Sequence, residues 1–471
     1  MSELTWGLFV ALAVSAIVVA LGMPFGPVLL FGLIIVFAIA FRYPYFTFYT
    51  AVALTPFLGF TLSVPTGELA FGKRAFGGSI DISVAESVLL VLLIAWAIKI
   101  LWYWVRRRDR NWKPVLPIVW AYASLVAAHV ISAFSPLMPD RVLVMKFVLR
   151  PVLFCYLAFI ALPVNFIRSR RRLMGTLSVF TGVGVFAALN GLVSLFFIDA
   201  TSQFIRRAHP LPLFGVPVLG DNHNLLAELM VVSVMATLAL YELSKTPRAK
   251  RILLAMAGFQ FLIGLLTFSR TAWIVFAVQA LFIGLLEYRE VLRKRLSQIL
   301  VAIVLLIPLA LVMASISTST VATSSNSTRT ALFEISMQAF LSSPFIGGGA
   351  GTFIERVGSA YVFRIEYGQP FDSHGILQKL AAETGLLGLL AFLAICLVLA
   401  REAYDGIRQL PPGPMRRVAI FLTAGAMGAI TYQLFNTNYW TGKMWLPIGI
   451  MLAAFHVLRR VHAESEEDAL V

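Results

Sequence analysis

The chain has few charged residues. They make up 13% of its 471 residues, against 59% hydrophobic residues and a mean hydropathy of +0.86. No soluble domain of this length has such a composition. Runs of about 18 or more apolar residues are typical of membrane-spanning helices, and these runs are continuous rather than alternating, which excludes a membrane β-barrel. The sequence therefore predicts an all-α, polytopic helical membrane protein.

Cysteine and histidine are also scarce, with two and six residues. Cys155 and Cys396 lie inside apolar runs, so neither a disulfide framework nor a zinc site follows. The polar loops contain no HExxH motif, clustered carboxylates or Cys/His ligand spacing, so we expect no metal and no cofactor. No basic stretch precedes the first apolar run, which favours a first membrane helix over a cleaved signal peptide.

The apolar segments predict about twelve to fourteen membrane helices. Two regions, 26–62 and 418–458, contain short or proline-interrupted segments and are candidates for re-entrant structure. We divide the single membrane domain 1–471 into N-terminal helices (1–198), a central region (199–400), and C-terminal helices with a tail (401–471). The predicted spans are 5–22, 26–41, 46–62, 82–104, 115–135, 142–163, 173–198, 224–243, 252–268, 271–286, 297–314, 375–400, 418–436 and 444–458.

The net charge of +15 comes from basic residues that stand in short clusters between apolar runs, so topology explains it better than nucleic-acid binding. With a cytoplasmic N-terminus, 24 of the 38 basic residues lie in inside loops, ten in outside loops and four within spans. This bias predicts that both termini are cytoplasmic and that the long loop 315–373 is outside. In that loop we expect a Ser/Thr-rich run, an amphipathic helix over 329–341 and a flexible glycine-rich segment over 347–351.

His374 stands where this long polar loop enters an apolar helix. We expect Asp372 or Ser373 to cap the helix. The positive end of the helix dipole disfavours an imidazolium, so the ring should be neutral and able to accept a proton. Gln378 lies four residues further on and shares its face. The alternative is an interfacial histidine that makes one structural hydrogen bond.

Several outside arginines break the charge bias, which suggests an anionic ligand on that face. Arg270 lies in a tight hairpin between two apolar runs, where it either snorkels to water or binds a phosphate. Arg206 and Arg207 lie in a second outside loop that continues to Asn222 and Asn224. That loop is either an ordinary solvated loop or a second phosphate contact with polar groups for a sugar.

Charged residues also occur within the predicted spans. Arg150 lies in a membrane helix, where a charge usually faces a cavity or a partner, so we include it among the substrate-binding candidates. Lys379 and Glu383 are four residues apart and are expected to neutralise each other.

Together these residues resemble the signature of bacterial O-antigen ligases and related polysaccharide polymerases. That signature is a histidine, one residue, nine further residues and GxxG, which here runs from His374 to Gly388. Gly375 takes the place of the Asn, Ser or Gln that usually follows the histidine. An O-antigen ligase and a polysaccharide polymerase therefore both remain as alternative functions. Three further stretches are similar to family motifs in the same order: Gly220–Glu228, Phe268–Ala272 and Pro344–Phe353.

The resemblance implies a membrane glycosyltransferase of the GT-C type in the bacterial inner membrane, with its active site facing the periplasm. Its donor is a glycan on undecaprenyl diphosphate. The acceptor is lipid A–core for an O-antigen ligase, the function we expect, or another glycan unit for an O-antigen or exopolysaccharide polymerase. On this basis His374 deprotonates or positions the acceptor hydroxyl, and Arg270 stabilises the departing diphosphate. Substrate-binding roles are expected for Arg206, Arg207, Asn222, Asn224, Arg150 and Gln378.

A flippase or transporter of lipid-linked oligosaccharides is the main non-enzyme alternative. Such a protein would also have twelve to fourteen spans and buried charges, but it more often shows internal symmetry. We find no internal repeat here. A transporter would also have no need of a long outside loop that ends in His374. A purely structural membrane subunit is the third possibility.

Overall fold

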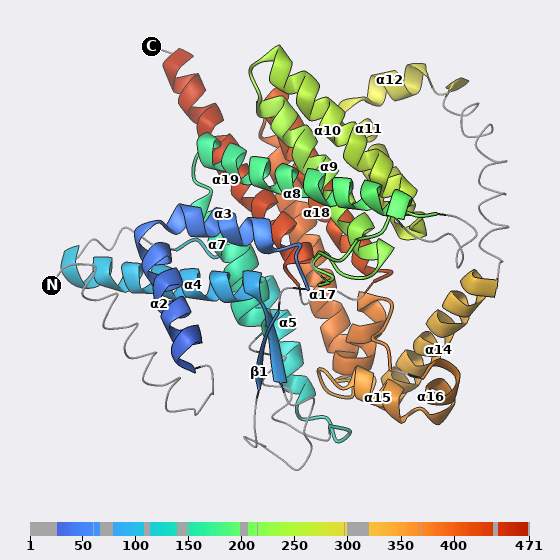
Figure 1. The fold of residues 1–471 in the computed structure, drawn as a ribbon. Coiled ribbons are helices and arrows are strands. Elements are labelled where there is room, and N and C mark those ends of the chain that lie inside the picture. The colour runs from blue at the N-terminus through green and yellow to red at the C-terminus, as the bar shows by residue number, and fades with distance from the viewer. Residues whose placement is uncertain are drawn as a thin grey trace.

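The computed structural model describes the chain in twelve stretches, and these are almost entirely helical (Figure 1). They are residues 26–59, 61–65, 79–107, 114–138, 148, 150–197, 206–213, 215–295, 297–298, 320–368, 370–436 and 441–469. The helices before the long loop are α2 (Gly26–Arg42), α3 (Pro44–Leu54), α4 (Val84–Arg107), α5 (Val119–Ser132), the π-helix η1 (Pro151–Ala161), α7 (Leu162–Phe166), α8 (Arg170–Phe197), α9 (His223–Leu243), α10 (Pro247–Leu266), α11 (Arg270–Glu287) and α12 (Arg289–Lys294). The later helices are α14 (Thr320–Ser342), α15 (Phe353–Ser359), α16 (Tyr361–Tyr367), α17 (Ile376–Arg408), α18 (Pro414–Gln433) and α19 (Gly442–Ala469).

Seven of the described helices are long and apolar enough to cross a membrane, namely α4, α8, α9, α10, α11, α17 and α19. An eighth span results if the α2–α3 pair, bent by 118°, counts as one. This confirms an all-α polytopic membrane protein. The predicted span 5–22 and residues 299–314 of the predicted span 297–314 lie outside the described residues. The span predicted at 46–62 ends earlier, at Leu54, because the chain then forms a small hairpin of β1 (Thr61–Pro65) and β2 (Ser79–Ser83).

Helix α9 lies at the centre of the bundle, packed against α8, α10 and α18 (Figure 1). Nearly every residue from Leu226 to Leu243 is buried, as expected for a helix that is apolar on all sides. Hydrogen bonds of polar side chains cross this core. Gln279 Nε2, for example, donates to the carbonyl oxygens of Val231 (3.1 Å) and Ala424 (3.0 Å). The core therefore fixes α9, α11 and α18 relative to one another.

The helix ends gather at two opposite ends of this bundle. At one end Arg170 donates to the Leu243 carbonyl (3.0 Å), and Arg417 pairs with Glu242 (2.9 Å) and Glu287 (3.5 Å). These contacts join loops that the charge count assigns to the same side of the membrane. The other end holds the starts of α9, α11 and α17 and the end of α18.

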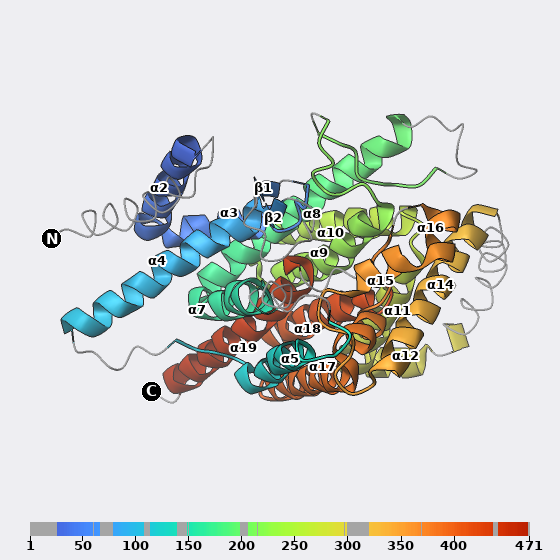
Figure 2. The same cartoon turned by 90° about the horizontal axis from the view of Figure 1, so that it is seen from below.

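The predicted outside loop 315–373 contains three helices rather than one. A single helix, α14, begins at Thr320 and includes the part of the Ser/Thr-rich run from Thr320 to Thr330, which we expected to precede the helix. Helices α14, α15 and α16 form a small layer at the edge of the bundle, beside the start of α17 (Figures 1 and 2). This layer has an apolar core of its own, made by Leu332, Ala339, Phe353, Val357, Phe363 and Ala382.

The glycine-rich segment 347–351 is mostly buried against α17, so the expectation of a flexible loop is wrong. Gly348 N donates to the Ala382 carbonyl and Gly349 N to the Glu383 carbonyl, each at 2.9 Å. The Glu383 side chain also accepts from Phe353 N (3.2 Å). These contacts form where α17 breaks at Gly385, whose φ of 61° and ψ of −153° are accessible essentially only to glycine.

Replacing Gly385 with alanine is expected to destabilise the fold by about 1–3 kcal/mol through this backbone conformation alone. A Cβ there would also lie 2.6 Å from the carbonyl carbon of Phe345. The melting temperature of the purified protein in detergent measures the effect. Gly182→Ala is the matched control, because no atom lies within 4 Å of its Cβ position in the helical interior of α8. Equal melting temperatures for the two variants would contradict the role assigned to Gly385.

Candidate active site

Two long helices begin side by side at the end of the bundle that adjoins α14. Asn222 caps α9 by accepting from Asn224 N (2.9 Å), and Ser269 caps α11 by accepting from Ala272 N (3.4 Å). Ser269 Oγ donates to Asn224 Oδ1 (2.8 Å), and Tyr432 at the end of α18 donates to the Asn224 carbonyl (2.7 Å). Because the start of a helix carries partial positive charge, two such starts joined together favour an anion nearby.

Arg270 is the first residue of α11, directly after the Ser269 cap, and its side chain is exposed. Phe268 turns the hairpin with a positive φ of 53°. This places Arg270 at the end of the bundle rather than within it. The Arg270 charge acts on a second arginine, Arg329, which reaches the same place from α14.

Arg329 is the main residue that the sequence analysis missed. Its half-buried guanidinium has a pKa below the ordinary value, first because of burial and then because of the Arg270 charge, while Tyr432 opposes the shift. Within the described part of the chain Arg329 forms no ion pair, and its buried Nε has no hydrogen-bond partner. The available signal was an arginine in a Ser/Thr-rich outside run, which was counted among the outside basic residues without a role of its own.

His374 lies two residues before α17 begins, and the local capping differs from the prediction. Gly375 is the N-cap and gives no side-chain hydrogen bond, so neither Asp372 nor Ser373 caps the helix. Asp372 instead accepts from Ser373 N (2.9 Å), and Ser373 Oγ donates to the Gly375 carbonyl (3.1 Å). The buried Lys379 forms an ion pair with Asp372 at 2.6 Å. These contacts fix the backbone that carries the His374 ring.

The environment of His374 favours its neutral form. The pKa of the half-buried ring is lower than usual, first because of burial and second because of the Arg329 charge, and Asp372 opposes the shift. A neutral imidazole nitrogen can accept a proton. The sequence analysis expected a neutral ring from the helix dipole, whereas burial and Arg329 are the causes here.

Arg207 lies against the start of α9, whereas Arg206 lies against the end of α8. Arg207 Nη1 lies 3.3 Å from His223 Nε2, which must be the acceptor because a guanidinium only donates. The His223 ring also lies within electrostatic range of Arg329 and His209. Arg206 instead donates to the Leu195 carbonyl (3.3 Å). Of the two neighbouring arginines, Arg207 is therefore placed to share a ligand with Arg270 and Arg329.

The three remaining predicted site residues are Arg150, Asn222 and Gln378. Arg150 pairs with Glu86 at 2.8 Å, and the same carboxylate accepts from Ser83 N (3.0 Å) at the start of α4. Asn222 acts as the exposed cap of α9. Gln378 is in the first turn of α17, near His374, and its side chain lies against Gly375. Among the described residues no group of three or more His, Cys, Asp or Glu is placed to hold a metal ion.

A comparison with known families agrees with this arrangement. Residues 253–393 match the family model described as O-Antigen ligase. The match spans α10, α11, the α14–α16 layer and the first half of α17, and so includes Arg270, Arg329 and His374. Arg207 and Tyr432 lie outside it. No curated protein sequence matches the chain.

Proposed function

Because the chain carries an O-antigen ligase domain over residues 253–393, we propose that it transfers a glycan from undecaprenyl diphosphate to an acceptor sugar. One observation carries this proposal. The Arg329 charge acts on Arg270, His223 and the half-buried His374, and Arg207 lies 3.3 Å from His223 at the start of α9. Such a site suits an anionic leaving group and a neutral base.

The arginines are proposed to hold the diphosphate of the donor. A guanidinium offers planar, paired donors that match phosphate oxygens. Arg329 favours an anion most strongly, because its half-buried charge faces Arg270 and has no carboxylate partner among the described residues. When the bond to the sugar breaks, negative charge grows on the diphosphate, and fixed positive groups stabilise that charge.

His374 is proposed to take the proton from the acceptor hydroxyl. The hydroxyl oxygen then forms a bond to the anomeric carbon of the donor glycan. The bond from that carbon to the diphosphate oxygen breaks, and undecaprenyl diphosphate leaves with the electron pair. The lipid diphosphate is already a good leaving group, so the proposed step uses neither nucleotide nor metal. The ion pair of Lys379 with Asp372 keeps the His374 backbone in place during this step.

We propose lipid A–core as the acceptor, and a second glycan repeat unit is the alternative. The alternative rests on Gly375, where the usual Asn, Ser or Gln is missing. A Cβ at this position would lie 2.8 Å from the Leu434 carbonyl oxygen, so the turn has little room for a side chain. Incubating purified protein with an undecaprenyl-diphosphate glycan, with and without lipid A–core, separates the two. Product on lipid A–core indicates a ligase, and a ladder of longer lipid-linked chains indicates a polymerase.

The same incubation tests the non-enzyme alternative. A flippase would move the lipid-linked glycan between the leaflets of a proteoliposome and leave the glycosidic bond to the diphosphate intact. Intact donor after prolonged incubation with either acceptor, together with leaflet exchange, would support a flippase and contradict the transfer reaction.

Replacing Arg270 with lysine is expected to reduce transfer by about tenfold or more although the charge remains, because an ammonium lacks the planar pair of donors. Initial transfer rates at saturating donor measure the loss. Arg206→Lys is the matched control, since the Arg206 side chain points to the Leu195 carbonyl. Near-normal turnover in the Arg270→Lys variant would leave Arg270 with a topological role only.

The active site is proposed to face the periplasm, with both termini in the cytoplasm. The charge bias of the loops supports this orientation. We expect a membrane-impermeant thiol reagent to label Ser359→Cys in cells with a permeabilised outer membrane and an intact inner membrane. Lys245→Cys, at the opposite end of the bundle, should react only after the inner membrane is opened. Both variants carry Cys396→Ala, and Cys155 is buried. The reverse pattern would overturn the orientation.

A further inference from the structure

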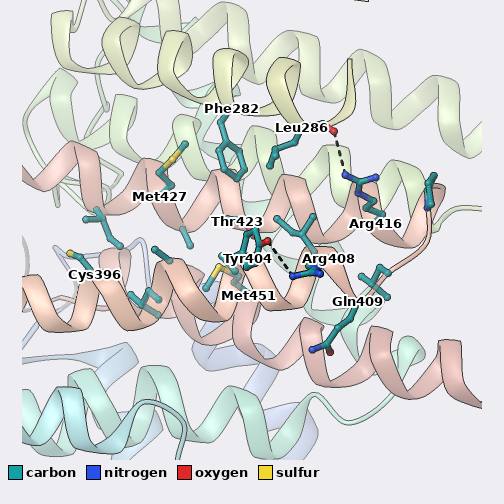
Figure 3. A pocket seen from close by; sticks show the side chains of 18 of the residues that line it. Phe282, Leu286, Cys396, Tyr404, Arg408, Gln409, Arg416, Thr423, Met427 and Met451 are labelled. Atoms are coloured by element: carbon teal, nitrogen blue, oxygen red, sulfur yellow. Dashed lines mark hydrogen bonds between the residues drawn. The ribbon is translucent and has the colours of Figure 1, made fainter. Parts of the chain in front are cut away.

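A large apolar cleft lies between α17 and α18 and is bordered by α11 (Figure 3). Its volume is about 900 Å³, near the upper end of the ~300–1,000 Å³ typical of small-molecule sites. It begins at the loop between α17 and α18, at Arg408 and Arg416. This is the end of the bundle opposite His374, because α17 starts beside His374 and ends at Arg408.

The length and lining of the cleft match an acyl chain. It follows α18 from Arg416 to Thr431, which corresponds to roughly 22 Å at the rise of an α-helix. One leaflet of the hydrocarbon core is about 15 Å thick. The inner part is lined by aliphatic, aromatic and sulfur side chains, among them Phe282, Cys396 and Met427 (Figure 3).

The mouth of the cleft is positively charged and lacks a counterion among the residues described. None of the described residues that line it is an aspartate or a glutamate. Arg408 donates only a long bond to the Tyr404 hydroxyl (3.4 Å), and Arg416 a long bond to the Leu286 carbonyl (3.5 Å). The buried Nε of Arg416 has no hydrogen-bond partner.

Two nearby acidic groups are paired with other arginines. Asp405 faces Arg401 at 3.8 Å, and Glu287 faces Arg417 at 3.5 Å. Neither carboxylate belongs to the cleft lining. Neither of the two arginines at the mouth forms an ion pair within the described part of the chain.

We propose that this cleft binds an anionic phospholipid, with an acyl chain along α18 and the phosphate between Arg408 and Arg416. Basic pockets between membrane helices favour anionic headgroups, because the bilayer holds the phosphate at the depth of the basic side chains. The headgroup lies in the leaflet opposite the candidate active site. The proposal does not rest on the transfer reaction, and this lipid is a bound partner rather than a substrate.

Native mass spectrometry of the detergent-solubilised protein tests this proposal. The probes are dioleoylphosphatidylglycerol and dioleoylphosphatidylcholine, which share acyl chains and differ in net charge. Wild-type protein is expected to retain the anionic lipid roughly tenfold better than the zwitterionic one, and the Arg408→Gln/Arg416→Gln double variant should lose that preference. Arg401→Gln is the matched control, because Arg401 is exposed on the same helix and lies outside the cleft.

A second variant tests the cleft itself. Ala400 lines the cleft and is exposed, so a tryptophan at this position fills the space without displacing the buried core. Ala400→Trp should fold and should reduce retention of the anionic lipid to the level of the double variant. Equal retention of the two lipids by wild-type protein, or unchanged retention in either the double variant or Ala400→Trp, would overturn the proposal.

Discussion

Replacing His374 with alanine is expected to reduce glycan transfer by roughly two to four orders of magnitude, the usual effect of removing a general base. The variant should still bind the lipid-linked donor, because Arg207, Arg270 and Arg329 remain. It should also fold, since the contacts that fix this turn come from Asp372 and its neighbours rather than from the imidazole. Donor binding, melting temperature and transfer rate are to be measured on one preparation.

His456→Ala is the matched control for this experiment, because His456 is exposed on α19 outside the cluster. It is expected to leave all three quantities unchanged. A stable His374→Ala protein with near-wild-type transfer would eliminate the catalytic role. A large fall in melting temperature with active surviving protein would instead support the structural alternative for His374.

Replacing Arg329 with glutamine is expected to reduce transfer by about two to three orders of magnitude, the usual loss when one preorganised group at a developing anion is removed. The reason is its half-buried charge, which faces Arg270 and makes no ion pair in the described part of the chain. Arg364→Gln is the control, because Arg364 is exposed on α16 in the same layer of helices. Equal rates for the two variants would remove Arg329 from the site.

The same variant should change the pH dependence of transfer. Activity requires neutral His374, so it falls as pH drops through the His374 pKa. The Arg329 charge holds that pKa below its ordinary value, together with burial, which is the larger cause. Arg329→Gln removes only the charge, and the pKa should therefore rise part of the way back. The acid limb of the rate profile is expected to move to higher pH, and an unmoved limb would contradict the assigned interaction.

The helical framework could be predicted from the sequence because a long apolar run has few alternatives in a membrane. The runs at 82–104 and 173–198 correspond to α4 and α8. The β1–β2 hairpin was not predicted, because its strands are short and follow an apolar run directly. The α14–α16 layer was predicted only in part, since its stability comes from packing on α17 rather than from the local pattern.

The residues of the candidate site also fall into those that the sequence could predict and those that it could not. Arg270 could be found because it stands between two apolar runs, and His374 because it stands where a polar loop meets an apolar helix. Arg329 could not, because its importance comes from its interaction with Arg270 and His223, which are far away in sequence. Lys379 also has a partner that was not predicted. The charges of Lys379 and Glu383 act on each other, as the four-residue spacing suggested. The turn brings Asp372 to 2.6 Å from Lys379 as well, and Glu383 also accepts from Phe353 N in the glycine-rich region.

A single-turnover assay with excess purified protein tests the central claim most directly. The donor is a defined undecaprenyl-diphosphate glycan and the acceptor is lipid A–core or a second lipid-linked glycan. The account predicts that new glycoside and free undecaprenyl diphosphate form in equal amounts, only when an acceptor is present, and far more slowly with His374→Ala or Arg329→Gln. The account would be contradicted if the donor stayed intact with both acceptors. It would also be contradicted if His374→Ala and Arg329→Gln both transferred glycan at the wild-type rate.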